Sequence, residues 1–256
     1  MHTAALRELG LAAQWTYQHL PVPPELLAET VRALPAAGFA GANVTVPHKQ
    51  AALALADEAT AAAHAIGAAN TLTFEGGGRD GVTVHADNTD APGLLAALPA
   101  DPRGATALVL GAGGSARAAV HALRTAGAAR VLIWNRTAAR AAALARELGG
   151  EPVEAPLPAV DVLVQCTAAG LLTPEEQLAE LPSLTNAVHA RTSVVDLLYT
   201  SQGSTPLIAF ARECGARVAD GLEVLVCQGA LSLERWTGRP APLDAMRAAA
   251  RGAGHT

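Results

Sequence analysis

Short apolar runs alternate with alanine- and leucine-rich segments of helical periodicity between about residues 105 and 220. Four of these runs have the length of buried strands, and a helical pattern separates each from the next. Strands that alternate with helices in this way predict βαβ units and a parallel sheet. The strands are expected at residues 107–110, 131–134, 160–165 and 194–197.

The chain up to about residue 84 has a different pattern, in which short strands and helices surround a glycine-rich turn at residues 76–78. In the two segments on either side of this turn, apolar and polar residues alternate, as they do in the arms of a hairpin. A proline near the start of one apolar-periodic segment marks the beginning of a helix. The expected elements are strands at 15–20 and 39–46, helices at 24–34 and from about 48, and the hairpin arms 70–74 and 82–85.

The last part of the chain predicts a long apolar-periodic helix at residues 222–236 and a second helix at 243–251. The segment 101–104, Asp-Pro-Arg-Gly, is expected to be a joint between the two patterned regions. The fold class is therefore α/β, with two α/β units rather than one.

Composition excludes several classes of protein. The chain has 256 residues, half of them apolar, and a formal charge of −5, so a nucleic-acid surface is not expected. No apolar run approaches the roughly 18 residues that span a bilayer. Cys166, Cys214 and Cys227 are far apart in the sequence and form no C-x-x-C pair, which indicates free thiols in a reducing compartment. We expect a soluble cytoplasmic protein.

A glycine-rich turn follows the first strand of the βαβ region. The run Gly111-Ala112-Gly113-Gly114-Ser115-Ala116 stands between that strand and a helix expected at 117–126. Glycines in this context allow a tight turn and close approach of the backbone, and the helix N-terminus receives a pyrophosphate. The sequence predicts a dinucleotide site; the alternative is a glycine turn used only for packing.

The type of dinucleotide is indicated by the end of the next strand. An NAD site usually has Asp or Glu at this point, whereas this chain has Asn135, Arg136 and Thr137, with Arg140 one turn later. Guanidinium groups bind a phosphate with two parallel hydrogen bonds. We therefore expect NADP, unless both arginines are only solvated helix charges.

Among 18 basic residues, only Lys49 is a lysine, and it ends the run Asn43-Val44-Thr45-Val46-Pro47-His48-Lys49. An ammonium can give up its proton in a suitable environment, which a guanidinium cannot do. Lys49 is therefore a candidate general acid or base. The alternative is a leftover solvated lysine at a helix start.

Several sequence blocks together resemble the shikimate dehydrogenase family. They cover nearly the whole chain in the family's order. The blocks are the run ending at Lys49, the glycine-rich turn, Asn135-Arg136-Thr137, and the segments Gly67-Ala68-Ala69-Asn70-Thr71, Asn88-Thr89-Asp90, Ala219-Asp220-Gly221-Leu222 and Gln228-Gly229-Ala230.

The resemblance implies NADP-dependent interconversion of 3-dehydroshikimate and shikimate in aromatic amino-acid biosynthesis. It implies a substrate domain at residues 1–88 plus 222–256 and a Rossmann NADP domain at 89–221, with the active site between them. Lys49 matches the family's catalytic lysine and Asp90 its partner. Residues matching contacts to the substrate hydroxyls are Thr45, Asn70, Tyr199 and Gln228.

The NADP site implied by the resemblance comprises Gly111, Gly113, Ala116, Asn135, Arg136, Thr137 and Arg140, and Gly221 marks the return of the chain to the substrate domain. Asp90 could instead cap the helix that begins at Ala91-Pro92. Use of quinate, or a non-catalytic NADP-binding relative, stays open as an alternative function. The assembly is expected to be a monomer or a homodimer.

The sequence departs from the family pattern in two places. Family members usually start with a strand and a Ser-x-Ser-Pro loop that holds the substrate carboxylate, whereas this sequence begins at what resembles the following helix. The expectation is that the chain as given binds NADPH normally and shikimate poorly, and that a form extended by that strand and loop has a lower KM.

The second departure is the loop 165–170, Gln-Cys-Thr-Ala-Ala-Gly, where relatives usually carry Asn-Ala-Thr. The different sequence of the loop 165–170 is expected to adjust contacts of the protein with the cofactor near the nicotinamide.

Overall fold

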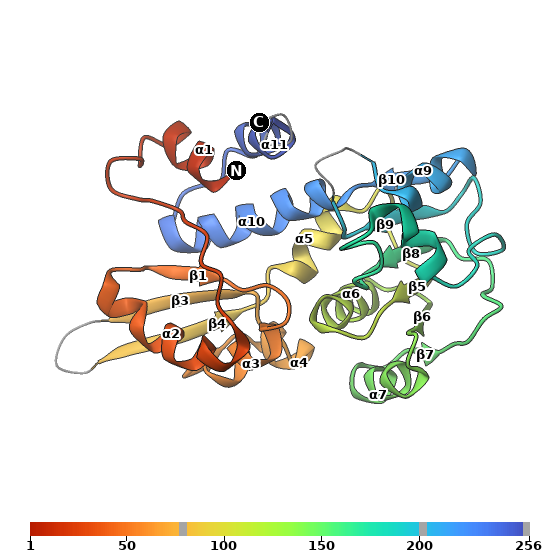
Figure 1. Cartoon of the computed structure of the whole chain (residues 1–256), viewed down its shortest axis with the longest axis horizontal. Helices are drawn as coiled ribbons and strands as arrows, with labels where there is room; N and C mark the ends of the chain where they lie inside the picture. The colour runs from red at the N-terminus through yellow and green to blue at the C-terminus, as the bar shows by residue number, and fades with distance from the viewer. Residues whose placement is uncertain (77–80, 200–203, 253–256) are drawn as a thin grey trace.

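The structure is a computed structural model and describes residues 1–76, 81–199 and 204–252 (Figure 1). These residues form two separate sheets, one of four strands and one of six, each packed against helices. The two sheets confirm an α/β chain with two units.

The six-stranded sheet is parallel throughout and has the order β10-β9-β8-β5-β6-β7. Because β5 lies at the centre, with later strands added on both sides, this is a doubly wound Rossmann arrangement. The strands are β5 (Thr106–Leu110), β6 (Arg130–Trp134), β7 (Glu151–Pro152), β8 (Val162–Gln165), β9 (Ser193–Asp196) and β10 (Arg217–Ala219). The expected βαβ region is confirmed, with small shifts at strand ends.

Both faces of this sheet are buried, which explains why its strands read as continuous apolar runs. Ala107 and Val109 of β5 point into a core shared with α6 (Gly114–Thr125) and α7 (Ala138–Leu148). Leu108 and Leu110 point to the opposite core, which includes residues of α9 (Pro206–Glu213). The short helices η3 (Pro174–Glu176) and α8 (Gln177–Glu180) precede α9.

The four-stranded sheet has the order β1-β3-β4-β2 and is mixed. Its strands are β1 (Gly41–Asn43), β2 (Glu58–Ala59), β3 (Thr71–Gly76) and β4 (Val82–Asp87). The antiparallel pairing of β3 with β4 confirms the expected hairpin, although residues 77 and 78 of its turn lie outside the described residues. The neighbouring helices are η1 (Pro24–Leu26), α2 (Leu27–Ala33), η2 (Pro35–Ala37), α3 (Lys49–Ala54) and α4 (Ala61–Ile66).

The strand expected at residues 15–20 is wrong, and the one expected at 39–46 is reduced to β1. A strand needs a hydrogen-bonded neighbour, and β1 is the edge of its sheet, so no ladder extends to residues 15–20 within the described chain. Side-chain contacts replace that ladder. The Tyr17 ring stacks on His2 at 4.1 Å between centroids, and its hydroxyl donates to Asn43 Oδ1 at 3.0 Å.

A long C-terminal helix, α10 (Gly221–Thr237), leads from the Rossmann sheet back over the four-stranded sheet (Figure 1). Asp220 caps its start by accepting from the Glu223 backbone N–H at 3.0 Å, and Gly238, with φ 65°, ends it. On its outer side it packs against α1 (His2–Glu8) and α11 (Leu243–Gly252), with Met246 fully buried between them.

The helix α5 (Asp90–Ala97) connects the two sheets and packs closely on α10. Gly93 permits this approach, because a Cβ at this position would lie 2.7 Å from the backbone nitrogen of Gln228. Any side chain at residue 93 would push the two helices apart.

We expect Gly93→Ala to lower the free energy of unfolding by about 1–3 kcal/mol, the usual cost of overpacking. Without the clash, alanine would stabilise the helix by about 1 kcal/mol relative to glycine. The clash therefore decides the sign of the change in the free energy of unfolding. The control is Gly252→Ala in α11, where a Cβ meets nothing within 4 Å. Urea unfolding of both variants measures the difference; a stabilised Gly93→Ala protein would contradict the packing argument.

His2 makes stability depend on pH. Burial lowers the pKa of His2 to about 4, and its Nε2 lies 3.1 Å from the Gly229 carbonyl oxygen. The unfolded chain binds the proton more strongly, so stability is full above about pH 6.5 and falls as the pH drops toward 4. Urea titrations across this range should show a weaker pH dependence for His2→Gln than for the unchanged chain. Equal slopes would show that His2 is not the group involved.

Candidate active site at the junction of the two sheets

The glycine-rich turn lies at the carboxyl edge of the parallel sheet, directly after β5. Gly111 has φ +122°, and a Cβ there would lie 3.1 Å from the Cys166 carbonyl carbon, so glycine is required. Gly113 precedes the first turn of α6, and a Cβ there would meet nothing within 4 Å. Ala116 is fully buried under the turn. The turn is tight at Gly111 and open at Gly113, which fits a bound pyrophosphate.

The arginines expected to bind a 2′-phosphate lie beside this turn. β6 pairs with β5 so that Trp134 is opposite Leu110, which places residues 135–137 next to Gly111. Arg136 and Arg140 are exposed, and neither forms an ion pair with any residue that the structure describes. The Asn135 amide donates to the Thr137 carbonyl at 3.0 Å and shapes the loop. The residues present therefore fit NADP.

The Lys49 ammonium and the Asp90 carboxylate form a shielded ion pair. Nζ of Lys49 lies 2.7 Å from Oδ2 of Asp90, and the two side chains are only 10% and 16% exposed. Lys49 begins α3 and Asp90 begins α5, so the pair joins distant parts of the chain. Taking both charges out of water is costly unless further hydrogen bonds satisfy them. Both ions have such partners here.

Asn70 supplies one of these partners and organises the site. Its Nδ2 donates to Asp90 Oδ1 at 2.9 Å and lies 3.1 Å from Gln228 Oε1 and 3.0 Å from Thr89 Oγ1. Its Oδ1 accepts from the Thr89 backbone N–H at 2.7 Å. Thr71 Oγ1 lies 3.2 Å from both Asn70 Oδ1 and Thr89 Oγ1. This buried network fixes the carboxylate that faces Lys49.

The alternative of Asp90 as a helix cap is not supported by the geometry. The residue before the helix is Thr89, and the side chain that accepts from the first turn is that of Asn88, whose Oδ1 accepts from the Ala91 backbone N–H at 3.2 Å. Asn88 Nδ2 donates to the Ala68 carbonyl at 2.8 Å. Both oxygens of Asp90 are directed at side chains of the site instead. Asp90 is thus free to act on Lys49.

Of the other residues expected to bind substrate, one belongs to the network around Asn70 and two do not. Gln228, on α10, joins the network through Asn70. Thr45 and Tyr199 are exposed side chains, and no hydrogen bond of either side chain to another described residue is found. A Cβ on Gly221 would lie 2.5 Å from the Leu198 carbonyl oxygen, so this glycine lets α10 start against the end of β9.

The loop 165–170 lies next to the glycine-rich turn, because Gln165 is opposite Leu110 in the sheet. Burial raises the pKa of the Cys166 thiol, which therefore stays protonated and unreactive at neutral pH. That the change in this loop adjusts contacts near the nicotinamide stays a prediction.

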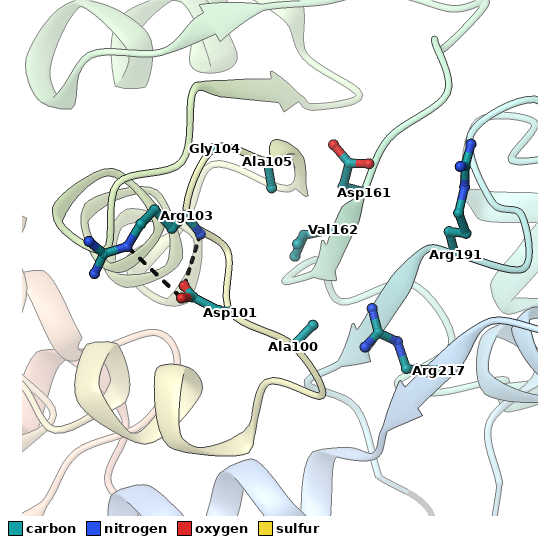
Figure 2. Close-up of a pocket in the computed structure, with 9 residues that line it drawn as sticks. All are labelled: Ala100, Asp101, Arg103, Gly104, Ala105, Asp161, Val162, Arg191 and Arg217. Atoms are coloured by element: carbon teal, nitrogen blue, oxygen red, sulfur yellow. Dashed lines mark hydrogen bonds and ion pairs between the residues drawn. The ribbon is translucent and has the colours of Figure 1, made fainter.

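A surface hollow elsewhere on the Rossmann sheet is not this site. Figure 2 shows it lined by Arg103, Asp161, Arg191 and Arg217, among others, near the amino ends of β5, β8, β9 and β10. Ligands of open parallel sheets bind at the opposite, carboxyl edge. The side chain of Arg103 is 81% exposed.

Comparisons with known proteins agree with this geometry. Family models match residues 1–72 ("Shikimate dehydrogenase substrate binding domain"), 96–198 ("Shikimate / quinate 5-dehydrogenase") and 221–251 ("Shikimate 5'-dehydrogenase C-terminal domain"). A shikimate dehydrogenase (NADP(+)) of Methanopyrus kandleri is 40% identical over 97% of this chain and 88% of its own length. The chain belongs to the shikimate dehydrogenase family.

Solved structures of the family superimpose over almost the whole chain. The Thermus thermophilus shikimate 5-dehydrogenase in complex with shikimate has a TM-score of 0.85 at 38% identity, covering 100% of this chain and 93% of that one. The same enzyme with NADP(H) and shikimate has a TM-score of 0.82 at 36% identity, covering 98% and 92%. In the described residues, no helix has the length and apolarity needed to cross a membrane, and the three cysteines are free.

The sequence did not indicate two features of this family site. Thr71 and Thr89 complete the network around Asn70. Both lie in the sequence blocks that resemble the family, but only Asn70 and Asp90 of those blocks were expected to have a role in the site. Ser115 was expected only at the cofactor and instead also contacts Lys49, with 2.9 Å between Oγ and Nζ. Ser115 and Lys49 are 66 positions apart, and no sequence periodicity predicts a contact over that separation.

Proposed function

We propose that this chain is an NADP-dependent oxidoreductase that reversibly reduces 3-dehydroshikimate to shikimate in the biosynthesis of chorismate and the aromatic amino acids. The observation that carries the proposal is the Lys49–Asp90 pair, with its 2.7 Å contact, placed against the first turn of α6. Family membership supports the substrate, and the exposed Arg136 and Arg140 support NADP over NAD.

The chemistry requires a proton at the oxygen of the reduced ring ketone. When bound, NADPH supplies the hydride. The Lys49 ammonium has three N–H groups, of which one donates to Asp90 and one to Ser115. The third can donate to the substrate oxygen and stabilise the developing alkoxide before transferring its proton. Asp90 holds the ammonium in place by accepting from it at 2.7 Å.

The remaining site residues have proposed binding roles. Asn70 and Gln228, joined at 3.1 Å, present polar atoms beside Asp90 and are proposed to contact the substrate hydroxyls with Thr45 and Tyr199. The domains are proposed to comprise residues 1–88 plus 222–256 and residues 89–221. A cytoplasmic location and a monomeric or homodimeric state stay predictions of the sequence.

Lys49→Ala should lower kcat by roughly 10²–10⁴-fold, the range for loss of a general acid, with a much smaller change in KM. Lys49→Arg should be nearly as inactive, because a guanidinium does not release its proton at neutral pH. Steady-state kinetics with shikimate, and in parallel with quinate, measure both variants. Unchanged circular dichroism and NADPH binding control for folding, since removing one ion of a buried pair is destabilising. A near-normal kcat would refute the assignment.

Replacing both Arg136 and Arg140 with alanine should weaken NADPH binding far more than NADH binding. Each charge-assisted contact to a phosphate contributes about 1.5–3 kcal/mol, and NADH has no 2′-phosphate. Arg146→Ala, at an exposed position in the last turn of α7, is the matched control. Dissociation constants for the two cofactors decide the matter, and equal losses for both would show that the arginines do not bind the 2′-phosphate.

A further inference from the structure

The contact between Ser115 and Lys49 connects the two halves of the site. Ser115 is in the first turn of α6, directly after the glycine-rich turn, and its Oγ lies 2.9 Å from Lys49 Nζ. Lys49 begins α3, beside the four-stranded sheet. The group proposed to deliver the proton is therefore hydrogen-bonded to the element proposed to bind the cofactor.

Gly114 makes this contact possible. A Cβ at residue 114 would lie 3.0 Å from Cβ and 3.2 Å from Cδ of Lys49, closer than side chains normally approach. The lysine stem therefore lies across the start of α6, against a position without a side chain. Gly114, the fourth residue of the glycine-rich turn, thus makes room for the Lys49 side chain as well as allowing the turn.

Arg117 fixes the distance between the two elements. Its Nε donates to the Ile66 carbonyl at 2.5 Å and its Nη1 to Glu147 Oε2 at 2.6 Å, while its guanidinium packs over Gly67. Arg117 is two residues beyond Ser115, and Ile66 ends α4, so α6 is fastened to the substrate side next to the Lys49 contact. The hydrogen bond from the Arg117 side chain to the Ile66 backbone thus holds α6 against the substrate side close to the Ser115–Lys49 contact.

The hydroxyl of Ser115 has a second hydrogen-bonding capacity. It accepts from the Lys49 ammonium, which leaves its own hydrogen free to donate. The first turn of a helix that follows a glycine-rich turn is where a phosphate binds. A hydroxyl that donates to an anion becomes a stronger acceptor, so hydrogen bonds in such a chain reinforce one another.

We propose that Ser115 is a positioning residue that couples occupancy of the dinucleotide turn to the orientation of the Lys49 ammonium. A cofactor phosphate that accepts from Ser115 strengthens the hold of Ser115 on Lys49 and keeps the third N–H directed at the substrate oxygen. Shikimate then binds more tightly to the NADP complex than to the free protein. This coupling rests on the proposed function, but the Ser115–Lys49 contact itself is testable without turnover.

The first experiment measures unfolding of the cofactor-free protein in a double-mutant cycle of Ser115→Ala and Lys49→Met. Ser115→Ala should raise the unfolding equilibrium constant by about fivefold or more when Lys49 is present, and by much less in the Lys49→Met background. Equal effects in both backgrounds would overturn the contact. Because no substrate or cofactor is used, this result is independent of whether the chain reduces 3-dehydroshikimate.

The second experiment compares binding and turnover of Ser115→Ala with those of Thr125→Ala. Thr125 is the matched control, because it is exposed at the far end of α6 and, among the described residues, its hydroxyl bonds only to carbonyls of that helix, at 2.8 and 3.0 Å. Shikimate affinity is measured by fluorescence titration with and without NADP⁺. Saturating NADP⁺ should tighten shikimate binding to the unchanged protein and to Thr125→Ala, and this tightening should be lost in Ser115→Ala.

In Ser115→Ala, kcat should fall about three- to tenfold, a modest part of the effect of removing a general acid. The NADPH dissociation constant should rise as well, because a charge-assisted hydrogen bond to a phosphate is lost. A tenfold or larger loss of NADPH affinity with normal kcat would overturn the proposal, since Ser115 would then be only a phosphate ligand. Unchanged kcat together with unchanged coupling between the two ligands would overturn it as well.

Discussion

The close approach of α5 and α10 is the constraint on which the rest of the site depends. These helices meet at Gly93, where a Cβ would lie 2.7 Å from the Gln228 backbone nitrogen. The first residue of α5 is Asp90, and Gln228 projects from α10, so a small separation of the helices would pull apart both sides of the Asn70 network. A single glycine thereby sets the position of the carboxylate that holds Lys49.

The shielded Lys49–Asp90 pair is stable because its surroundings replace water. Burial of two charges costs free energy that their attraction alone often does not recover. Asn70 Nδ2 satisfies the second oxygen of Asp90 at 2.9 Å, and Ser115 accepts a second hydrogen of the ammonium at 2.9 Å. The third N–H of the ammonium has no acceptor among the residues that the structure describes. In the proposed mechanism, this remaining donor is the one directed at the ketone oxygen.

The sequence by itself determined the fold class and the type of cofactor, and it supplied the candidate residues of the two half-sites. Continuous apolar strands separated by helices specify a parallel sheet because both of its faces are buried, and the glycine-rich turn after β5 marks the carboxyl edge. The replacement of an acidic residue by Asn135 and Arg136 indicates the cofactor, and the single lysine is the candidate proton donor. These signals are local, because each depends on residues that are neighbours in the chain.

Only the tertiary structure decided how the half-sites meet. Residues 15–20 have the composition of a strand, but a strand exists only with a paired neighbour, and the described chain supplies none at the edge of β1. Whether Asp90 caps a helix or holds Lys49 was open in the sequence; in the structure Asn88 accepts from the Ala91 backbone N–H, and Asp90 contacts Lys49. The contact of Ser115 with Lys49 joins residues that no periodicity relates. Such contacts depend on how closely helices pack, and packing is a property of the whole chain.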